Sequence, residues 1–335
     1  MYPPATIMSS FHSYAFGLGI ESDVPIDGLP PVPAAAPDLR IHMGSLPETY
    51  DRGDPGAREI WRSEPDPAEP GDAVALHASG NGDFLSLRYA DGTYFVLRRS
   101  GDEVWAVWPD SLSTAAAATY LLGPVIGFVL RLRGRTCFHA SAVVVADRVV
   151  LLAGPAGIGK SSTAAALALR GRRVIADDIA VIDTLAGQWV VHPSIPSVRL
   201  WDDVVETLYG QREALPLLAP GWEKRQLDLR TLAAGFCADQ AVPLGAIYLL
   251  STATARGRAE RVRGREALMA LVANTYANVL LDAPMRSVEF VVLSALVRDV
   301  PVWRVGVPDQ ISDLPAFCAR IEAAGPSSEF GPDRP

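Results

Sequence analysis

Cysteine is scarce in this chain of 335 residues. Cys137, Cys237 and Cys318 lie far apart, and no CxxC pair or Cys/His cluster occurs. This pattern excludes a zinc site of the usual spacing and a disulfide framework, and it fits a reducing compartment. The sequence also lacks a basic run interleaved with aromatic residues. Together with a formal net charge of −8, this absence argues against non-specific binding to nucleic acid or anionic lipid.

Long apolar runs are also few. The N-terminal segment lacks the charged region and apolar core of a signal peptide, so we expect a cytoplasmic protein. The stretch Ser111–Leu130 carries no charge and is about long enough to span a bilayer. Its first half, however, is mostly Ala and Thr, and Gly123-Pro124 interrupts it. We therefore expect residues 111–134 to form a buried, kinked linking helix, without stable membrane insertion.

The length favours two domains, and 49% hydrophobic residues can fill a sizeable core. Residues 1–110 are expected to be β-rich, because short alternating or apolar segments are separated by turn residues. The expected strands are Tyr14–Ile20, Leu39–Met43, Ala73–His77, Phe84–Tyr89, Tyr94–Arg98 and Glu103–Trp108. Asp91-Gly92 predicts a hairpin, whereas the Pro-rich segment Ile26–Pro37 and the polar segment Pro47–Gly71 predict loops.

After the linking helix, strand and helix patterns alternate, which indicates an α/β domain over residues 135–325. The expected strands are Cys137–Val145, Arg148–Ala153, Arg173–Ala176, Ile179–Asp183, Ala246–Leu250 and Val302–Val307. The expected helices are Ser161–Arg170, Glu266–Leu281, Val288–Val297 and Leu314–Ala323. Residues 326–335 are expected to form a disordered tail.

A phosphate-binding loop stands between an expected strand and an expected helix. The G-x-x-x-x-G-K-[ST] motif (Walker A) is matched in full by Gly154, Pro155, Ala156, Gly157, Ile158, Gly159, Lys160 and Ser161. Its glycines let the backbone N–H groups approach phosphate oxygens. The helix that follows points its N-terminus at the same place, so Ser162 in its first turn is also expected to bind the nucleotide. Lys160 would face the β- and γ-phosphates, and Ser161 would offer its hydroxyl to Mg²⁺.

Two aspartates, Asp177 and Asp178, follow the next apolar strand. Carboxylates beside a P-loop hold Mg²⁺ or its waters in nucleotide-hydrolysing enzymes. A pair allows one carboxylate to hold the metal while the other accepts a proton from an attacking hydroxyl. A solvated turn between two strands is the alternative.

His139 reaches the same place through an expected antiparallel hairpin. The strands 138–145 and 149–153 flank a turn at residues 146–148, so opposite residues should have numbers that sum to about 294. His139 would then face Pro155, where its ring could polarise an aspartate or contact phosphate. An exposed histidine at a strand end is the alternative.

These residues resemble the catalytic core of HPr kinase/phosphorylase. The resemblance rests on His139-Ala140-Ser141, on the loop, and on Arg170–Asp178 (RGRRVIADD), and it covers roughly residues 135–200. It implies a P-loop kinase core with a mixed sheet and flanking helices. It further implies that His139 and Lys160 are active-site residues, that Asp178 accepts the proton of a serine hydroxyl, and that Asp177 lies at the metal. The sequence leaves open which aspartate takes which role.

Two departures limit this resemblance. Ser197 stands where the family has a metal-binding glutamate, which puts the second metal ligand and the reverse phosphorylase reaction in doubt. The family's P-V-R-P-G-R-N segment is also missing, which argues against HPr as the substrate.

The layout of the whole chain is similar to that of HPr-kinase-like proteins from lasso-peptide and related biosynthetic clusters. The shared features are Phe16–Asp23, the helix that leads into the His139 strand, Pro196–Trp201 and Glu223-Lys224-Arg225. This resemblance implies a kinase for a serine of a ribosomal precursor peptide. Arg199, Lys224 and Arg225 could bind a phosphate or a peptide carboxylate. A solvated basic surface, or pairing of Arg199 with Asp202 or Asp203, is the alternative.

The sequence therefore predicts an ATP- and Mg²⁺-dependent serine kinase that acts on a peptide or protein. A small-molecule kinase and a non-catalytic nucleotide-binding regulator remain open alternatives. A homo-oligomer is compatible with the sequence.

Overall fold

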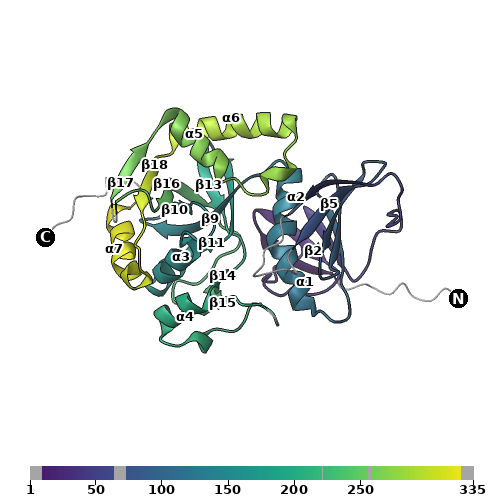
Figure 1. Ribbon diagram of the computed structural model, residues 1–335, viewed down its shortest axis with the longest axis horizontal. Helices are drawn as coiled ribbons and strands as arrows, with labels where there is room; N and C mark the ends of the chain where they lie inside the picture. The colour runs from purple at the N-terminus through teal and green to yellow at the C-terminus, as the bar shows by residue number, and fades with distance from the viewer. Residues whose placement is uncertain (1–9, 64–72, 221, 256–257, 326–335) are drawn as a thin grey trace. The chain divides into compact units, whose positions relative to one another are not determined.

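The computed structural model describes residues 10–63, 73–220, 222–255 and 258–325. The chain divides into two compact units, Met1–Arg133 and Gly134–Pro335 (Figure 1). The expected tail 326–335 and part of the expected loop, residues 64–71, lie outside the described residues.

The first unit contains a mixed sheet with the strand order β1-β2-β3-β8-β7-β6-β5-β4. Strands β2, β3 and β8 are parallel neighbours, and the other pairs are antiparallel. The bounds are β1 (Phe11–Ala15), β2 (Leu18–Ser22), β3 (Leu39–Met43), β4 (Arg58–Arg62), β5 (Val74–Ala78), β6 (Phe84–Tyr89), β7 (Tyr94–Arg98) and β8 (Glu103–Val107).

Two sequence predictions for this unit are wrong. The expected strand Tyr14–Ile20 is a hairpin, because Phe16 and Gly17 both adopt positive φ (59° and 75°) and reverse the chain between β1 and β2. The expected loop Pro47–Gly71 contains β4, which pairs with β5. The predicted hairpin at Asp91-Gly92 is confirmed, since it joins the antiparallel strands β6 and β7.

The apolar helix also belongs to the first unit. It consists of α1 (Thr114–Tyr120), a π turn η2 (Leu121–Val125) and α2 (Ile126–Leu132), with non-helical backbone angles at Gly123 before Pro124. By length and composition alone this helix could cross a membrane, but 83% of its most apolar 18-residue window is buried, as in the core helix of a soluble protein. The Tyr120 hydroxyl donates to Asp91 at 2.8 Å, and its ring packs 4.2 Å from that of Tyr89.

The second unit contains a mixed sheet with the order β10-β9-β12-β13-β16-β18-β17, in which β11 pairs with β9 and β10 also pairs with β16. Strand β9 pairs with both β10 and β12, and strand β16 pairs with both β10 and β13. The strands β9, β12, β13, β16 and β10 therefore pair in a closed circuit. The bounds are β9 (Thr136–Val145), β10 (Arg148–Ala153), β11 (Val174–Ala176), β12 (Ile179–Leu185), β13 (Gln188–His192), β16 (Val242–Ser251), β17 (Ala259–Val262) and β18 (Val302–Gly306).

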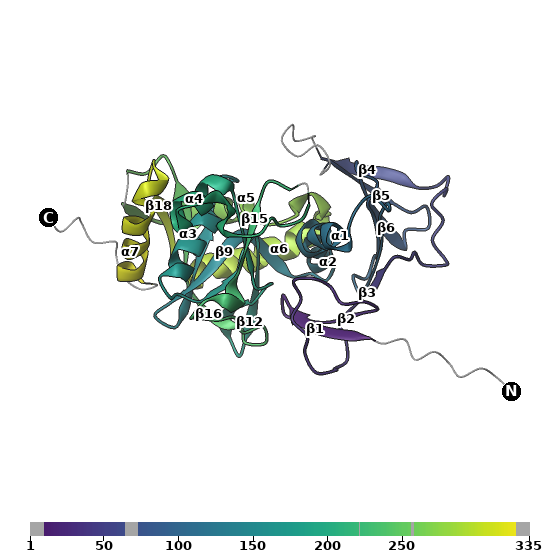
Figure 2. The same ribbon diagram turned by 90° about the horizontal axis from the view of Figure 1, so that it is seen from below.

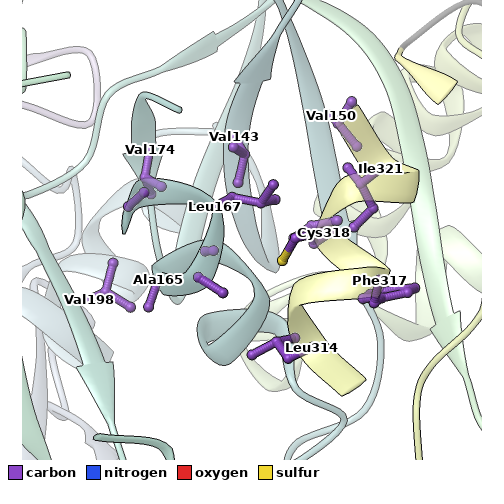
Figure 3. Close-up of a cluster of buried hydrophobic side chains, with 14 of the residues drawn as sticks. Val143, Val150, Ala165, Leu167, Val174, Val198, Leu314, Phe317, Cys318 and Ile321 are labelled. Atoms are coloured by element: carbon purple, nitrogen blue, oxygen red, sulfur yellow. The ribbon is translucent and has the colours of Figure 1, made fainter. Parts of the chain in front are cut away.

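Helices cover both faces of this sheet (Figures 1 and 2). Side chains of β9 and β10 alternate between two buried clusters. One cluster joins Val143 and Val150 to α3 (Lys160–Leu169) and α7 (Leu314–Ala324), and it includes Leu167 and Cys318 (Figure 3). The other joins Ala142 and Leu151 to α5 (Gly264–Ala273) and α6 (Ala283–Asp299). The predicted α/β class is therefore confirmed.

A small antiparallel ribbon, β14 (Ser197–Leu200) with β15 (Arg225–Asp228), stands apart from the large sheet. Helix α4 (Asp202–Tyr209) lies between its two strands in the sequence. The elements β13, β15, β17 and α4 were not expected from the sequence. Short 3₁₀ turns complete the described unit: η3 (Arg212–Ala214), η4 (Leu229–Thr231), η5 (Asn278–Leu280) and η6 (Ile311–Asp313).

Candidate active site

The phosphate loop occupies residues 154–159, between β10 and α3. Gly154 passes close to β16, because a Cβ at this position would lie 3.0 Å from the Leu250 carbonyl oxygen. Gly159 adopts φ 96° at the start of α3, and no side chain caps the first N–H groups of that helix. A Cβ on Gly159 would meet nothing within 4 Å, so the space beside this residue is open. The loop therefore offers free backbone donors to an anion.

Lys160 lies folded over this loop. The residue is 6% exposed, and its Nζ donates to the carbonyl oxygens of Gly154 and Pro155, both at 2.8 Å. Burial lowers the pKa of Lys160, while the negative charges of Asp178 and Asp177 oppose that shift. The ammonium group is thus held at the loop, within electrostatic reach of both aspartates.

Asp177 is the buried member of the acidic pair. The residue is 5% exposed; Oδ1 accepts from the Ser141 hydroxyl at 2.6 Å and Oδ2 from the Arg199 amide at 3.3 Å. Burial raises the pKa of Asp177; the Ser141 bond lowers it, the charge of Asp178 raises it, and a hydrogen bond from Ser161 lowers it. Asp177 therefore sits next to the hydroxyl that was expected to bind Mg²⁺.

Asp178 is the more open member of the pair. It adopts φ 68°, and its Oδ1 lies 3.0 Å from Nδ1 of His139. Burial alone would raise the pKa of Asp178, but the bond and charge of His139, with the charges of Arg199 and Lys224, lower it to about 2. The carboxylate is therefore ionised at neutral pH, and its side chain remains 30% exposed. An ionised, partly exposed carboxylate can accept a hydrogen bond from an incoming hydroxyl.

The expected hairpin between β9 and β10 exists, but its predicted register is wrong by one residue. Ala140 lies opposite Ala153, so partner numbers sum to 293 and His139 does not face Pro155. The cause is the turn, which has two residues, Ala146 and Asp147, both with positive φ (48° and 62°). His139 instead pairs with Ile179 at the start of β12, which places it directly beside Asp178.

One segment near His139 was missed from the sequence. The expected helix Glu266–Leu281 ends at Ala273, because residues 274–276 leave it and run along β9. The Asn274 carbonyl accepts from the His139 amide at 2.9 Å, and the Tyr276 ring lies 6.1 Å from the His139 ring. A helix-ending signal at Asn274 was the available clue. These residues lie along the edge of β9 opposite β12, the edge that β10 also takes, and they hold the histidine from that side.

The three basic residues proposed for the substrate have different surroundings. Arg199 and Lys224 both act electrostatically on Asp178. Arg225 does not join them: its Nε donates to Asp202 at 2.6 Å and its Nη1 to the Leu215 carbonyl at 2.7 Å. Arg225 is held as a structural residue of the ribbon.

The loop and the acidic pair fit a nucleotide with its metal ion. The open backbone of the loop and the Lys160 ammonium suit phosphate, and Ser161 beside Asp177 suits Mg²⁺, which usually keeps several waters and takes one or two carboxylates. No group of three His, Cys, Asp or Glu side chains that could hold a metal occurs among the described residues. Ser197 is buried, and its Oγ has no hydrogen-bond partner within the described part of the chain.

Comparison with known proteins points to one part of the chain. A curated HPr kinase/phosphorylase from Lactobacillus delbrueckii subsp. bulgaricus is 43% identical over 63 residues, which is 18% of this chain and 20% of that protein. The chain thus matches only a fifth of that relative's length. A solved Hpr(Ser) kinase/phosphatase from Coxiella burnetii superposes with a TM-score of 0.33 and 14% identity, over 56% of this chain and 86% of the other. Residues 131–199, which contain His139, the loop and both aspartates, match the family described as the HPr Serine kinase C-terminal domain.

Proposed function

We propose that this protein is an ATP- and Mg²⁺-dependent kinase that phosphorylates a serine hydroxyl of a peptide or protein. The observation that carries the proposal is the division between the two aspartates. Asp177 is buried next to Ser161 of the loop, whereas Asp178 is partly exposed and oriented by His139. A binding site alone does not need the second, oriented carboxylate.

The roles follow from position. The loop N–H groups and Lys160 would hold the β- and γ-phosphates, and Ser161 with Asp177 would hold Mg²⁺. The bound metal neutralises charge on the phosphates. Asp178 would orient the acceptor hydroxyl and take its proton, while His139 keeps that carboxylate ionised and correctly turned. Transfer then depends chiefly on positioning and charge, as is general for phosphoryl transfer.

The acceptor is the finer part of the proposal. We place the reaction in the cytoplasm, and we infer a ribosomal precursor peptide of the lasso-peptide type as the acceptor, from the layout of the sequence. The relative from Lactobacillus is named an HPr kinase/phosphorylase. This chain, however, lacks the P-V-R-P-G-R-N segment of that family, which argues against HPr as its substrate.

One observation favours a second candidate, a nucleotide-binding regulator without transfer. Ser197 opens β14 with a buried hydroxyl, where the resembling family carries a metal-binding glutamate. A serine is a weaker metal ligand than a carboxylate. Loss of that ligand would spare nucleotide binding and reduce transfer.

Asp178→Asn separates these candidates, because asparagine keeps the size of the side chain and removes the base. Purified protein would be incubated with γ-labelled ATP, Mg²⁺ and serine peptides, and separately with a mixture of hydroxyl metabolites. We expect label on a peptide serine with the wild type, little with Asp178→Asn, and equal ATP affinity for both. Label on a metabolite would identify a small-molecule kinase. Tight ATP binding without any transfer by the wild type would favour the regulator.

A further inference from the structure

The sheet of the first unit carries aromatic side chains on both of its faces. Tyr89 packs against Phe95 of β7 and against Tyr120 of the apolar helix, so Phe95 faces that helix. Tyr94 precedes Phe95 in β7 and therefore points to the other face. There it belongs to a small buried cluster with Phe84, Val96 and Trp105, against which Leu46, Tyr50 and Val107 pack. This second face has no part in the proposed kinase site.

Two guanidinium groups lie against the ring of Tyr94 on this face. The Arg52 Cζ is 4.6 Å from the ring centroid, and the Arg88 Cζ is 5.4 Å from it. Arg88 lies directly opposite Tyr94 in the β6–β7 pair, whereas Arg52 belongs to the loop between β3 and β4. The ring itself is fixed by a hydrogen bond between the hydroxyls of Tyr94 and Tyr50. Two positive charges thus share one ring, although like charges repel each other.

Neither guanidinium has a carboxylate partner within the described residues. A third arginine of this face, Arg98, donates to Glu103 at 2.6 Å. By contrast, Arg52 and Arg88 make no ion pair or hydrogen bond through their side chains with the part of the chain that the structure describes. The Arg88 Nε is buried and has no hydrogen-bond partner there. A buried donor without a partner costs free energy, and a bound anion would remove that cost.

Two carboxylates close to these arginines in sequence or register are bound elsewhere. Asp51 accepts from a backbone amide two residues later at 2.8 Å. Glu59 accepts from Arg62 at 3.1 Å and lies 3.6 Å from His77. The pKa of Glu59 is lowered chiefly by its bond with Arg62, and the charge of Arg88 is the smallest of the causes. The positive charge beside Tyr94 is therefore not neutralised by either acid.

The loop that carries Arg52 is anchored to the sheet. Asp54 accepts from the amides of Gly56 at 2.8 Å and Gly80 at 2.7 Å, and Gly80 belongs to the turn between β5 and β6. A Cβ on Gly80 would lie 2.9 Å from the Gly56 Cα, so the loop and the turn approach closely where both have glycine. The backbone of Arg52 therefore has a defined position, while its exposed side chain can turn toward a ligand.

We propose that Arg52 and Arg88, beside the Tyr94 ring, form a binding site for a phosphate monoester in the first unit. Such a group carries about −1.5 to −2 charges at pH 7 and three acceptor oxygens, so it suits two guanidinium groups better than a single carboxylate does. Guanidinium also binds two oxygens of one phosphate in parallel. The partly buried Arg88 would hold the phosphate, and the exposed Arg52 would close on it.

This inference goes beyond the proposed kinase function and does not depend on it. The monoester can be a phosphorylated side chain of a peptide or a small phosphorylated metabolite. Both sources present the same phosphoryl group to the two arginines, so the experiment has to separate them.

Calorimetric titration of the whole protein tests the site, with the phosphate loop filled by Mg²⁺ and a non-hydrolysable ATP analogue. The ligands are a phosphoserine peptide, the same peptide with serine or glutamate, and glycerol 3-phosphate. We expect a monoester to bind roughly tenfold or more tightly than the serine and glutamate peptides, the size of one charge-assisted contact. Binding of the phosphopeptide alone identifies a peptide source, and binding of glycerol 3-phosphate alone identifies a small metabolite. Binding of neither, or equal binding of the glutamate peptide, would overturn the inference.

Variants connect the binding to the two arginines. Arg52→Gln and Arg88→Gln should each weaken binding of the monoester roughly tenfold or more, and Arg88→Lys should recover only part of it, because an ammonium group does not bind two oxygens in parallel. Arg58→Gln is the matched control, since this exposed arginine of β4 lies opposite Ala78 and faces the other side of the sheet. Thermal unfolding shows whether each variant is folded. A folded Arg52→Gln protein that binds the monoester like the wild type would overturn the inference.

Chemical modification of arginine locates the bound ligand directly. Phenylglyoxal treatment followed by mass spectrometry reports each arginine separately. The monoester should protect Arg52 and Arg88, and it should leave Arg58 as reactive as before. Calorimetric binding without protection of Arg52 and Arg88 would place the monoester elsewhere and would contradict the proposed site.

Discussion

His139 and Ser141 lie on the same face of β9, and each holds one of the two neighbouring aspartates. The earlier residue of the strand holds the later aspartate, and the later residue holds the earlier one. His139 contacts Asp178 at 3.0 Å, and Ser141 donates to Asp177 at 2.6 Å. The order follows from the antiparallel pairing of β9 with β12, in which His139 lies opposite Ile179. One strand thus orients both carboxylates, the buried Asp177 next to Ser161 of the loop and the partly exposed Asp178 next to His139.

Ser141→Ala should shift the acidic side of the pH–rate profile to higher pH. Burial already raises the pKa of Asp177, and the Ser141 bond opposes that rise. Without the bond, the carboxylate stays protonated to a higher pH and binds Mg²⁺ more weakly there. The profile of kcat/KM against pH, recorded at fixed Mg²⁺, checks this. Ser194→Ala also removes a buried hydroxyl, one that donates to the Ile195 carbonyl at 3.5 Å, and should leave the profile in place.

His139→Ala should lower the free energy of unfolding in a pH-dependent manner. The pKa of Asp178 is lowered from 3.8 to about 2, largely through His139 acting against burial. Such a shift stabilises the fold above the unfolded pKa, and the stabilisation disappears as pH falls through the folded pKa. The variant should therefore be less stable at about pH 6 and approach the wild type between about pH 4 and pH 2. Urea unfolding at several pH values measures this, and a difference that grows on acidification would contradict it.

Lys160→Ala should abolish phosphate transfer and weaken ATP binding. The ammonium group is held at the loop by two carbonyl oxygens and is oriented before nucleotide arrives. Removal of one preorganised positive group at a developing charge costs about 100-fold or more in rate. Initial rates and calorimetric titration with ATP measure the two effects. Arg148→Ala, at the exposed hairpin turn, should change neither, and a Lys160→Ala protein with normal turnover would exclude the loop as the donor site.

Gly159→Ala should cost stability and nucleotide affinity together. Gly159 has φ 96°, which an L-residue adopts only at a cost of about 1–2 kcal/mol. Its Cβ would meet no protein atom within 4 Å, so steric conflict within the protein adds nothing. Thermal unfolding with and without ATP should show a lower Tm and a smaller ATP-induced rise. Unchanged ATP stabilisation would mean that phosphate does not approach this side of the loop.

Much of the candidate site could be predicted because it is local in sequence. The loop, its helix and the acidic pair after β11 each depend on neighbouring residues, and the structure shows them at the expected places. The register of the β9–β10 hairpin could not be predicted, since it depended on whether the turn had two or three residues. The end of α5 was also missed, because pairing of Thr275 with Phe138 overrode the helical pattern.

The phosphate loop follows from local sequence, since glycine conformation and a helix N-terminus need only consecutive residues. The α/β alternation follows from apolar periodicity. The surroundings of the loop depend instead on contacts between distant segments. Antiparallel pairing of β9 with β12 brings Ser141 to Asp177 and His139 to Asp178, and this separates a buried carboxylate from an open one. Pairing of β14 with β15 places Lys224 over Trp201, while Arg225, one residue away, is turned to Asp202. Such contacts join residues distant in sequence, and backbone hydrogen bonding between strands sets them, so no local pattern encodes them.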